Sequence, residues 1–107
     1  MTSEGAPDLS ALCADVAVEL EDVAASGSGD VTTWARCGND FARVSGSVLE
    51  ARLPLDIGEA ALRTPDTTPV AGERGWVRFT PVSGGRDVAD RAEAWFRTAW
   101  RHADPKS

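Results

Sequence analysis

The sequence predicts a single α+β domain in which two long helices pack on one face of a four-stranded antiparallel sheet, in the order α-β-β-β-α-β-α. Apolar residues recur at helical spacing near both ends of the chain. Between them, apolar and polar residues alternate in short runs separated by turn signals such as Gly-Asn-Asp and Gly-Ser. A chain of 107 residues can bury one modest core. We therefore expect one domain over residues 1–107, with its core at about 8–103 and flexible ends at 1–7 and 104–107.

The first element is a predicted helix in the segment 7–29, which the Ser-Gly-Ser-Gly run ends. Asp8 is a suitable N-cap. The apolar positions at helical spacing are Leu9, Leu12, Cys13, Val16, Leu20 and Val23. On a neighbouring face of this helix, Asp15, Glu19 and Asp22 follow one another at i, i+4 and i+7 and form a predicted acidic ridge.

Four strands and two more helices are predicted after it. Strands are expected at about 31–37, 41–45 and 48–53, and a fourth at 75–81. A short helix at 54–65 has a predicted capping box from Asp56 to Glu59. The segment 64–74, rich in proline and threonine, is expected to be a surface loop. The last helix lies in the segment 84–103 and is expected to be capped by Asp87, with Val88, Ala92, Trp95, Phe96 and Ala99 on one apolar stripe.

Strand alternation suggests a candidate binding surface. In the segment 72–81, Trp76 lies between two arginines, and residues two apart on a strand share a face. Each strand has an aliphatic set that suits the helices, which leaves an aromatic and basic set for the open face of the sheet. That set is Trp34, Arg36, Phe41, Arg43, Glu50, Arg52, Trp76 and Arg78. Arginine stacks on indole rings and binds carboxylates and phosphates in bidentate fashion.

Three interpretations of this surface stay open. Arginine and tryptophan pairs can simply keep an open sheet face in water. They are also frequent anchors at protein interfaces, and they suit an anionic or planar ligand. As a hypothesis, Trp34, Arg36, Arg43, Arg52, Trp76 and Arg78 form the contact surface, for a protein partner or a second copy of the chain.

Charge and composition narrow the classes of function. The first 30 residues carry seven acidic and no basic side chains, whereas the rest carry ten acidic and eleven basic ones. This distribution disfavours nonspecific nucleic-acid binding. There is one histidine, no tyrosine and no nucleophile with a nearby base, so no enzyme activity and no cofactor are expected. Cys13 and Cys37 are expected to be buried free thiols.

The expected location is the cytoplasm. The N-terminus lacks a basic segment followed by an apolar one, and no apolar run approaches the roughly 20 residues of a membrane span. The sequence is therefore interpreted as a soluble protein of bacterial cytoplasmic character, with no membrane partner.

Several motifs in 31–103 together resemble a known family. In order they are W…G-N-D-F-A-R-V-S-G, V-L-E-A-R-L-P, E-A-A-L-R-T-P, G-W-V-R-F and A-E-A-W-F-R-T-A-W-R. This order and spacing resemble the MmcQ/YjbR-like proteins. The small luciferase-like domain family also has a G-W-V-x-F strand before its last helix, but the paired histidines expected there are missing.

The resemblance to MmcQ/YjbR-like proteins implies an antiparallel sheet flanked by helices, similar to the double-wing and frataxin-like folds. It implies DNA binding by analogy of fold, although the single lysine and the acidic first helix speak against that function. A frataxin-like acidic ridge would instead imply weak iron binding at Asp15, Glu19, Glu21 and Asp22. The prediction that results is a non-catalytic binding or interaction module, with DNA binding and weak metal binding as alternatives.

Overall fold

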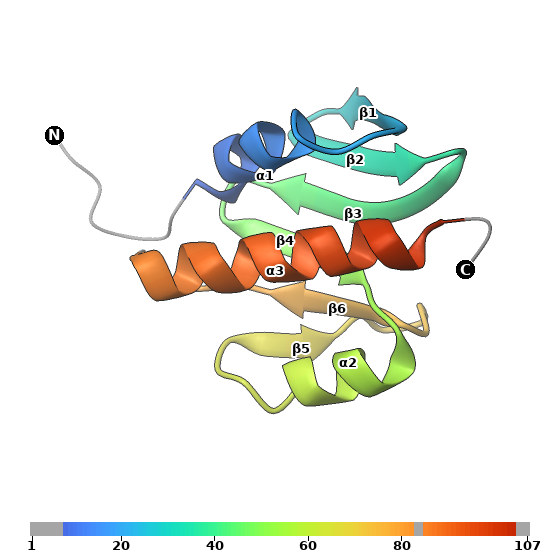
Figure 1. Cartoon of the computed structure of the whole chain (residues 1–107). Helices are drawn as coiled ribbons and strands as arrows, with labels where there is room; N and C mark the ends of the chain where they lie inside the picture. The colour runs from blue at the N-terminus through green and yellow to red at the C-terminus, as the bar shows by residue number, and fades with distance from the viewer. Residues whose placement is uncertain (1–7, 83–84, 105–107) are drawn as a thin grey trace, which may run out of the picture.

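One open, six-stranded antiparallel sheet organises the residues that the structure, a computed structural model, describes: 8–82 and 85–104 (Figure 1). The strands are β1 (Val23–Ser28), β2 (Val31–Arg36), β3 (Asn39–Ser45), β4 (Val48–Arg52), β5 (Thr67–Pro69) and β6 (Trp76–Phe79), in the spatial order β1-β2-β3-β4-β6-β5. The helices are α1 (Leu9–Ala17), α2 (Leu55–Ala61) and α3 (Arg86–His102). All three lie on one face of the sheet (Figure 1). The predicted α+β class is confirmed, but the predicted number of four strands is wrong.

The first additional strand, β1, replaces the second half of the predicted first helix. α1 ends at Ala17, and a positive φ of 59° at Asp22 helps to turn the chain into β1. All six residues of β1 pair with β2, from Val23 opposite Arg36 to Ser28 opposite Val31. Serine and glycine weaken the helix here, and pairing with β2 over the full length of the strand outweighs what helical propensity remains.

The second additional strand, β5, lies within the predicted loop 64–74. Thr67, Thr68 and Pro69 pair with Phe79, Arg78 and Val77 of β6. Proline has no N–H group to donate to a neighbouring strand, so it is tolerated at an edge such as this one. The segment is thus a short edge strand as well as a connection.

The three predicted helix caps have different outcomes. Asp8 is the N-cap of α1, and its carboxylate accepts hydrogen bonds from the backbone N–H groups of Ser10 and Ala11 at 3.1 and 3.2 Å. The predicted capping box from Asp56 to Glu59 is wrong, because α2 starts after Pro54 without a side-chain cap. Asp87 does not cap α3 either. It lies in the first turn of the helix, where a negative charge still interacts favourably with the helix dipole.

The core lies between the sheet and the helices, and α3 supplies its centre. Ala92, Phe96 and Ala99 are completely buried, as the predicted stripe requires. The ring of Phe96 contacts the rings of Phe41 and Trp34 edge to face, with centroid distances of 5.2 and 5.6 Å. On the other side of the sheet's centre, Trp95 of α3 contacts the ring of Phe79 in β6 edge to face, with a centroid distance of 5.0 Å, so α3 crosses the middle of the sheet. Within 8–82 and 85–104, no helix combines the length and apolarity that a membrane crossing requires.

Only one of the two cysteines is buried, so the prediction of two buried thiols is wrong for Cys37. Cys37 and Gly38 form the tight turn between β2 and β3, with φ angles of 51° and 85°. Two successive positive φ angles are typical of a two-residue hairpin turn, and such a turn exposes its side chains to solvent. Cys13 is fully buried in α1, and burial raises its pKa to about 12.

We predict that a thiol reagent at pH 8 modifies one thiol per chain in the native protein and two after unfolding. The thiolate is the reactive form, and both burial and the raised pKa keep Cys13 protonated and inaccessible. Mass spectrometry identifies the modified residue. In the control variant Cys37→Asn, which preserves a positive φ, native labelling should vanish. Native labelling of Cys13 would contradict the burial of α1 against the sheet.

We also predict opposite effects of the same substitution at two glycines. An added Cβ at Gly58 of α2 would lie 3.9 Å from the Leu53 Cβ and 4.0 Å from the Val77 Cγ1, which are ordinary contact distances. Gly58→Ala should therefore raise the free energy of unfolding by about 0.5–1 kcal/mol. Gly75 has a φ of 89°, so Gly75→Ala should lower it by about 1–2 kcal/mol. Urea denaturation measures the free energy of unfolding of both variants. A change of the same sign in the two variants would contradict the backbone conformations described for Gly58 and Gly75.

Candidate interaction surface around Trp76

Four of the six predicted contact residues lie on the open face of the sheet. Directly paired residues share a face, and the ladder pairs Arg43 with Glu50, Glu50 with Arg78, and Arg52 with Trp76. The structure thus brings Arg43, Arg52, Trp76 and Arg78 to one side, opposite to the helices.

The other two predicted contact residues, Trp34 and Arg36, lie on the face that the helices cover, so the prediction of one shared face is wrong for them. Trp34 packs against Phe96 of α3. The guanidinium of Arg36 lies 3.9 Å above the ring of Trp100, also in α3, and donates a hydrogen bond of 3.1 Å to its backbone carbonyl. These two side chains hold α3 to the sheet and are not available to a partner on the open face.

An irregularity between β2 and β3 explains a further difference from the prediction, the position of Phe41. Trp34 pairs with Ala42, but Ala35 pairs with Asp40, so Phe41 has no partner across the ladder. Such a bulge shifts the alternation of side chains along one strand. Phe41, which was predicted on the open face, is completely buried beside Ala42. The aromatic Trp34 also buries more apolar surface under α3 than the small side chains that were predicted to face the helices.

A network of ion pairs surrounds Trp76 on the open face, and we name its five residues Arg43, Glu50, Glu73, Trp76 and Arg78 the Trp76 cluster. The Nε atom of Arg43 lies 2.9 Å from a carboxylate oxygen of Glu50, and its Nη2 atom donates a hydrogen bond of 2.8 Å to Glu73. Arg78 binds the other Glu50 oxygen at 2.8 and 2.9 Å. The guanidinium carbon of Arg43 lies 4.1 Å from the centre of the Trp76 ring. Arg43 is therefore held by two carboxylates and an indole at once.

The electrostatics of the cluster are balanced. Burial acts to lower the pKa of Arg43, but the hydrogen bond to Glu73 and the charges of Glu50, Glu73 and Asp40 outweigh it, and the pKa is raised. Two arginines face two glutamates, so the cluster has no formal net charge. Among 8–82 and 85–104, neither Arg52 nor Arg74 forms an ion pair, and both side chains are exposed. They are the cations that remain for a partner near Trp76.

A pocket of about 170 Å³ adjoins the cluster, between α2 and the segment that leads into β6. Its lining is mainly apolar and includes Leu53, Leu55, Leu62, Val70 and Val77. Glu73 and Trp76 belong to both the pocket and the cluster. None of the sequence patterns described above predicts this pocket.

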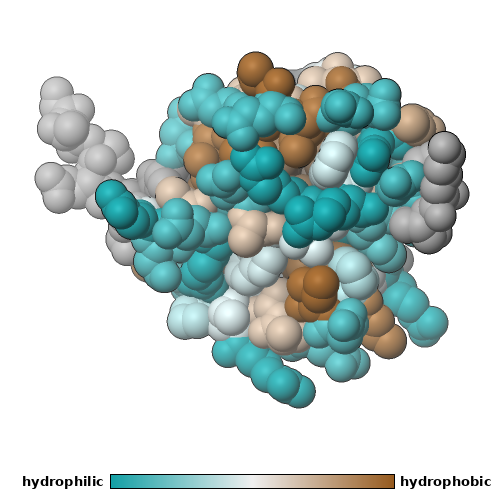
Figure 2. Space-filling view, viewed as in Figure 1, coloured by the Kyte–Doolittle hydropathy of each residue, from teal (hydrophilic) through white to brown (hydrophobic). Residues whose placement is uncertain are grey.

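A sequence signal for the pocket was present at residues 55–62, in α2 and directly after it. Leu55 and Leu62 line the pocket and are exposed by 73 and 38%, and Ile57 beside them is exposed by 37%, more than expected for apolar residues next to a core. In Figure 2, hydrophobic side chains accordingly reach the surface over α2. Three apolar residues within eight positions could have indicated a partly open apolar site.

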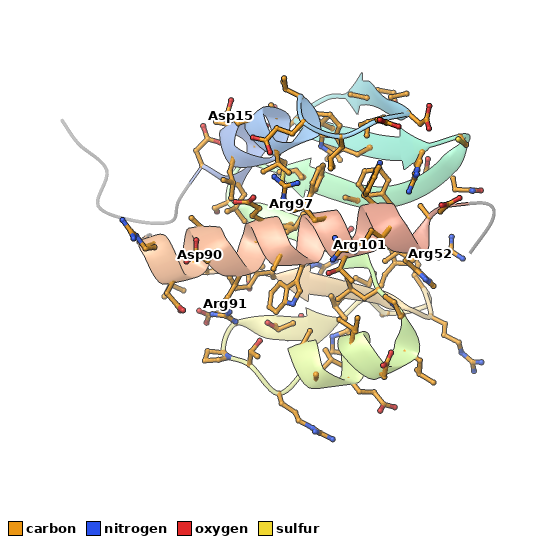
Figure 3. All side chains as sticks on the ribbon, viewed as in Figure 1. Asp15, Arg52, Asp90, Arg91, Arg97 and Arg101 are labelled. Atoms are coloured by element: carbon orange, nitrogen blue, oxygen red, sulfur yellow. The ribbon has the colours of Figure 1, made fainter. Side chains whose placement is uncertain are left out.

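The predicted acidic ridge does not form. Asp15 lies in α1, but Glu19 and Asp22 come after the end of that helix. Arg97 extends from α3 toward α1 and binds Glu19 (Figure 3). In the part of the chain that the structure describes, no three His, Cys, Asp or Glu side chains are grouped to hold a metal ion. Asp15, Glu19 and Asp22 therefore do not follow one another along a helix face, and weak iron binding at these residues stays a prediction.

We predict that Arg43→Ala lowers the free energy of unfolding by about 1–2 kcal/mol. The substitution removes the cation–π contact with Trp76 and takes a positively charged partner from the carboxylates of Glu50 and Glu73. The matched control Arg52→Ala removes an exposed arginine from the same face and should change stability by less than about 0.5 kcal/mol. Urea denaturation compares the two variants. Equal effects would mean that the network contributes nothing to stability.

Comparison of the chain with protein-family models, with curated proteins and with solved structures finds no match. The resemblance to MmcQ/YjbR-like proteins stays a prediction, and so does the DNA-binding function that it implies.

Proposed function

We propose that this protein is a non-catalytic module that binds another protein through the Trp76 cluster and the adjoining pocket. All three helices lie on one face of the sheet (Figure 1), and Trp76 lies on the opposite face. The observation that carries the proposal is that Trp76 and Glu73 also line an apolar pocket, which lies between α2 and the segment that leads into β6. Tryptophan and arginine next to a small apolar pocket are typical of the energetic centre of a protein interface.

The size of the pocket favours a side chain of a partner over a free ligand. Small-molecule sites usually enclose about 300–1,000 Å³. A cavity of about 150 Å³ accommodates a single benzene ring. The pocket of about 170 Å³ thus suits one aromatic or aliphatic side chain. The ion pairs of the Trp76 cluster would form the polar rim around that anchor.

The pairing of the arginines favours a protein partner over nucleic acid. Arg43 and Arg78 already bind Glu50 and Glu73, so an anionic polymer would have to compete with these carboxylates. Arg52 and Arg74 alone would neutralise about two phosphates. Binding to nucleic acid through them would be weak, and its affinity would change little with salt concentration. We therefore rank DNA binding below a protein interaction.

The cytoplasm is the location that we propose. Both cysteines are free, and Cys37 is exposed. An exposed free thiol is more typical of a reducing compartment than of an oxidising one.

The proposal predicts site-dependent crosslinking in the native cells. A photoreactive amino acid at Arg52, the cross-strand neighbour of Trp76, should give a discrete crosslinked species. The same group at Arg101, an exposed arginine of α3, should not (Figure 3). Denaturing electrophoresis followed by mass spectrometry identifies the product.

A second substitution ties the crosslink to the indole. Trp76→Ala in the Arg52 crosslinking variant should reduce the crosslinked fraction at least tenfold, because interface tryptophans commonly contribute about 2 kcal/mol or more. Urea denaturation must show that the variant remains folded. Equal crosslinking from Arg52 and Arg101, or a crosslink that survives the loss of Trp76, would disprove the proposed surface.

A further inference from the structure

We propose a second binding surface, distinct from the Trp76 cluster: the outer edge of β1 docks an extended peptide segment with an uncharged centre and basic residues on both sides. The sheet ends at β1 on one side and at β5 on the other. These two edges are built differently, and the difference points to the function of β1.

The edge at β5 is protected, whereas the edge at β1 is not. β5 has only three residues and contains Pro69. β1 has six residues, Val-Ala-Ala-Ser-Gly-Ser, with neither a proline nor a charged side chain. Its ladder with β2 is regular from Val23 to Ser28, without a bulge. Short length, proline, charge and bulges are the features by which proteins prevent unwanted pairing at an edge, and β1 has none of them.

The backbone of β1 has hydrogen-bonding groups to offer. In an antiparallel ladder, alternate residues direct their N–H and C=O groups to opposite sides of the strand. β2 occupies the inner side of β1, and no other strand within 8–82 and 85–104 pairs with the outer side. The residues from Ala24 to Gly27 are exposed, and β1 lies at the rim of the molecule (Figure 1). An extended peptide can therefore add to the sheet as a seventh strand.

Charge determines which peptide suits this edge. Glu21 and Asp22 directly precede β1, and Asp30 follows it in the turn to β2, all three exposed. Antiparallel pairing of two copies would place Asp30 of each chain near Asp22 of the other, and parallel pairing would align identical acids. Both arrangements bring like charges together. A peptide with lysine or arginine on each side of an uncharged centre would instead pair with these acids.

The side chains around the edge leave room for the centre of the peptide. Ala24 and Ser26 share one face of β1, and Val23, Ala25 and Gly27 share the other. Alternate side chains of an added strand would lie beside these small residues, so β-branched or aromatic side chains can be accommodated there. Trp76 on β6 is four strands away, roughly 19 Å, so the two surfaces can be tested separately.

The test is an NMR titration of the full ¹⁵N-labelled chain with the peptide Lys-Arg-Thr-Val-Thr-Val-Thr-Arg-Lys. We expect shift changes at β1 and its flanking turns. We also expect slower amide exchange at alternate residues of β1, because only these direct their N–H groups outward. A peptide in which glutamate replaces every lysine and arginine should bind at least tenfold more weakly. Shifts centred on β5 or Trp76, equal binding of both peptides, or no binding would overturn the proposal.

Two aspartates with the same backbone conformation provide a matched control. Asp22 and Asp66 have φ angles of 59° and 63°, which asparagine tolerates, and they lie at opposite edges of the sheet. Asp22→Asn should weaken binding of the basic peptide by about threefold to fivefold at low salt, whereas Asp66→Asn should not change it. Equal effects of both variants would overturn the role of the acids around β1. If sedimentation experiments showed that the free chain dimerises through β1, a second copy of the chain and not a basic peptide would be the partner of this edge, and the proposal would be overturned.

Discussion

Phe96 lies where α3 crosses the sheet, and its contacts with Phe41 and Trp34 hold the two layers together. All three rings are wholly or partly buried, and each aromatic pair contributes about 0.5–1.5 kcal/mol beyond the apolar area that it removes from water. The direction of neighbouring side chains follows from this packing. Because Trp34 turns toward α3, Arg36 on the same strand also points there and binds Trp100.

A sheet that buries only one face exposes the other to water, and this exposed face must not present a large apolar surface that would promote aggregation. The strands β3, β4 and β6 solve this with ion pairs, in which Arg43 and Arg78 share Glu50. The strands β1 and β2 use small or uncharged side chains such as Ala24, Ser26 and Thr33. The open face therefore has a charged, aromatic half and a small, neutral half. The first offers side-chain contacts near a pocket, and the second ends in an edge that offers backbone hydrogen bonds.

The fold gathers the uneven charge of the chain at one side of the sheet. The acidic N-terminal part contains α1 and β1, which lie at one side of the sheet, and Arg97 of α3 neutralises Glu19 where this part meets the last helix. Glu21, Asp22 and Asp30 stay exposed around β1. The paired charges of the Trp76 cluster lie toward the other side. The two proposed surfaces differ accordingly: one attracts basic residues, and the other accepts an apolar anchor within a neutral rim.

The sequence by itself determined the features that depend on local order: the α+β class, the Asp8 cap, the buried stripe of α3 and the open-face positions of Arg43, Arg52, Trp76 and Arg78. Tertiary structure alone decided the features that depend on a distant partner. The segment from Val23 to Ser28 becomes a strand because β2 is there to pair with it, and β5 forms because β6 is there. The alternation along β2 is unbroken, and only the packing of Trp34 against Phe96 and of Arg36 against Trp100 decides which of its two faces turns inward. The pocket near Trp76 arises between segments that are separate in sequence, and no local pattern specifies the space between them.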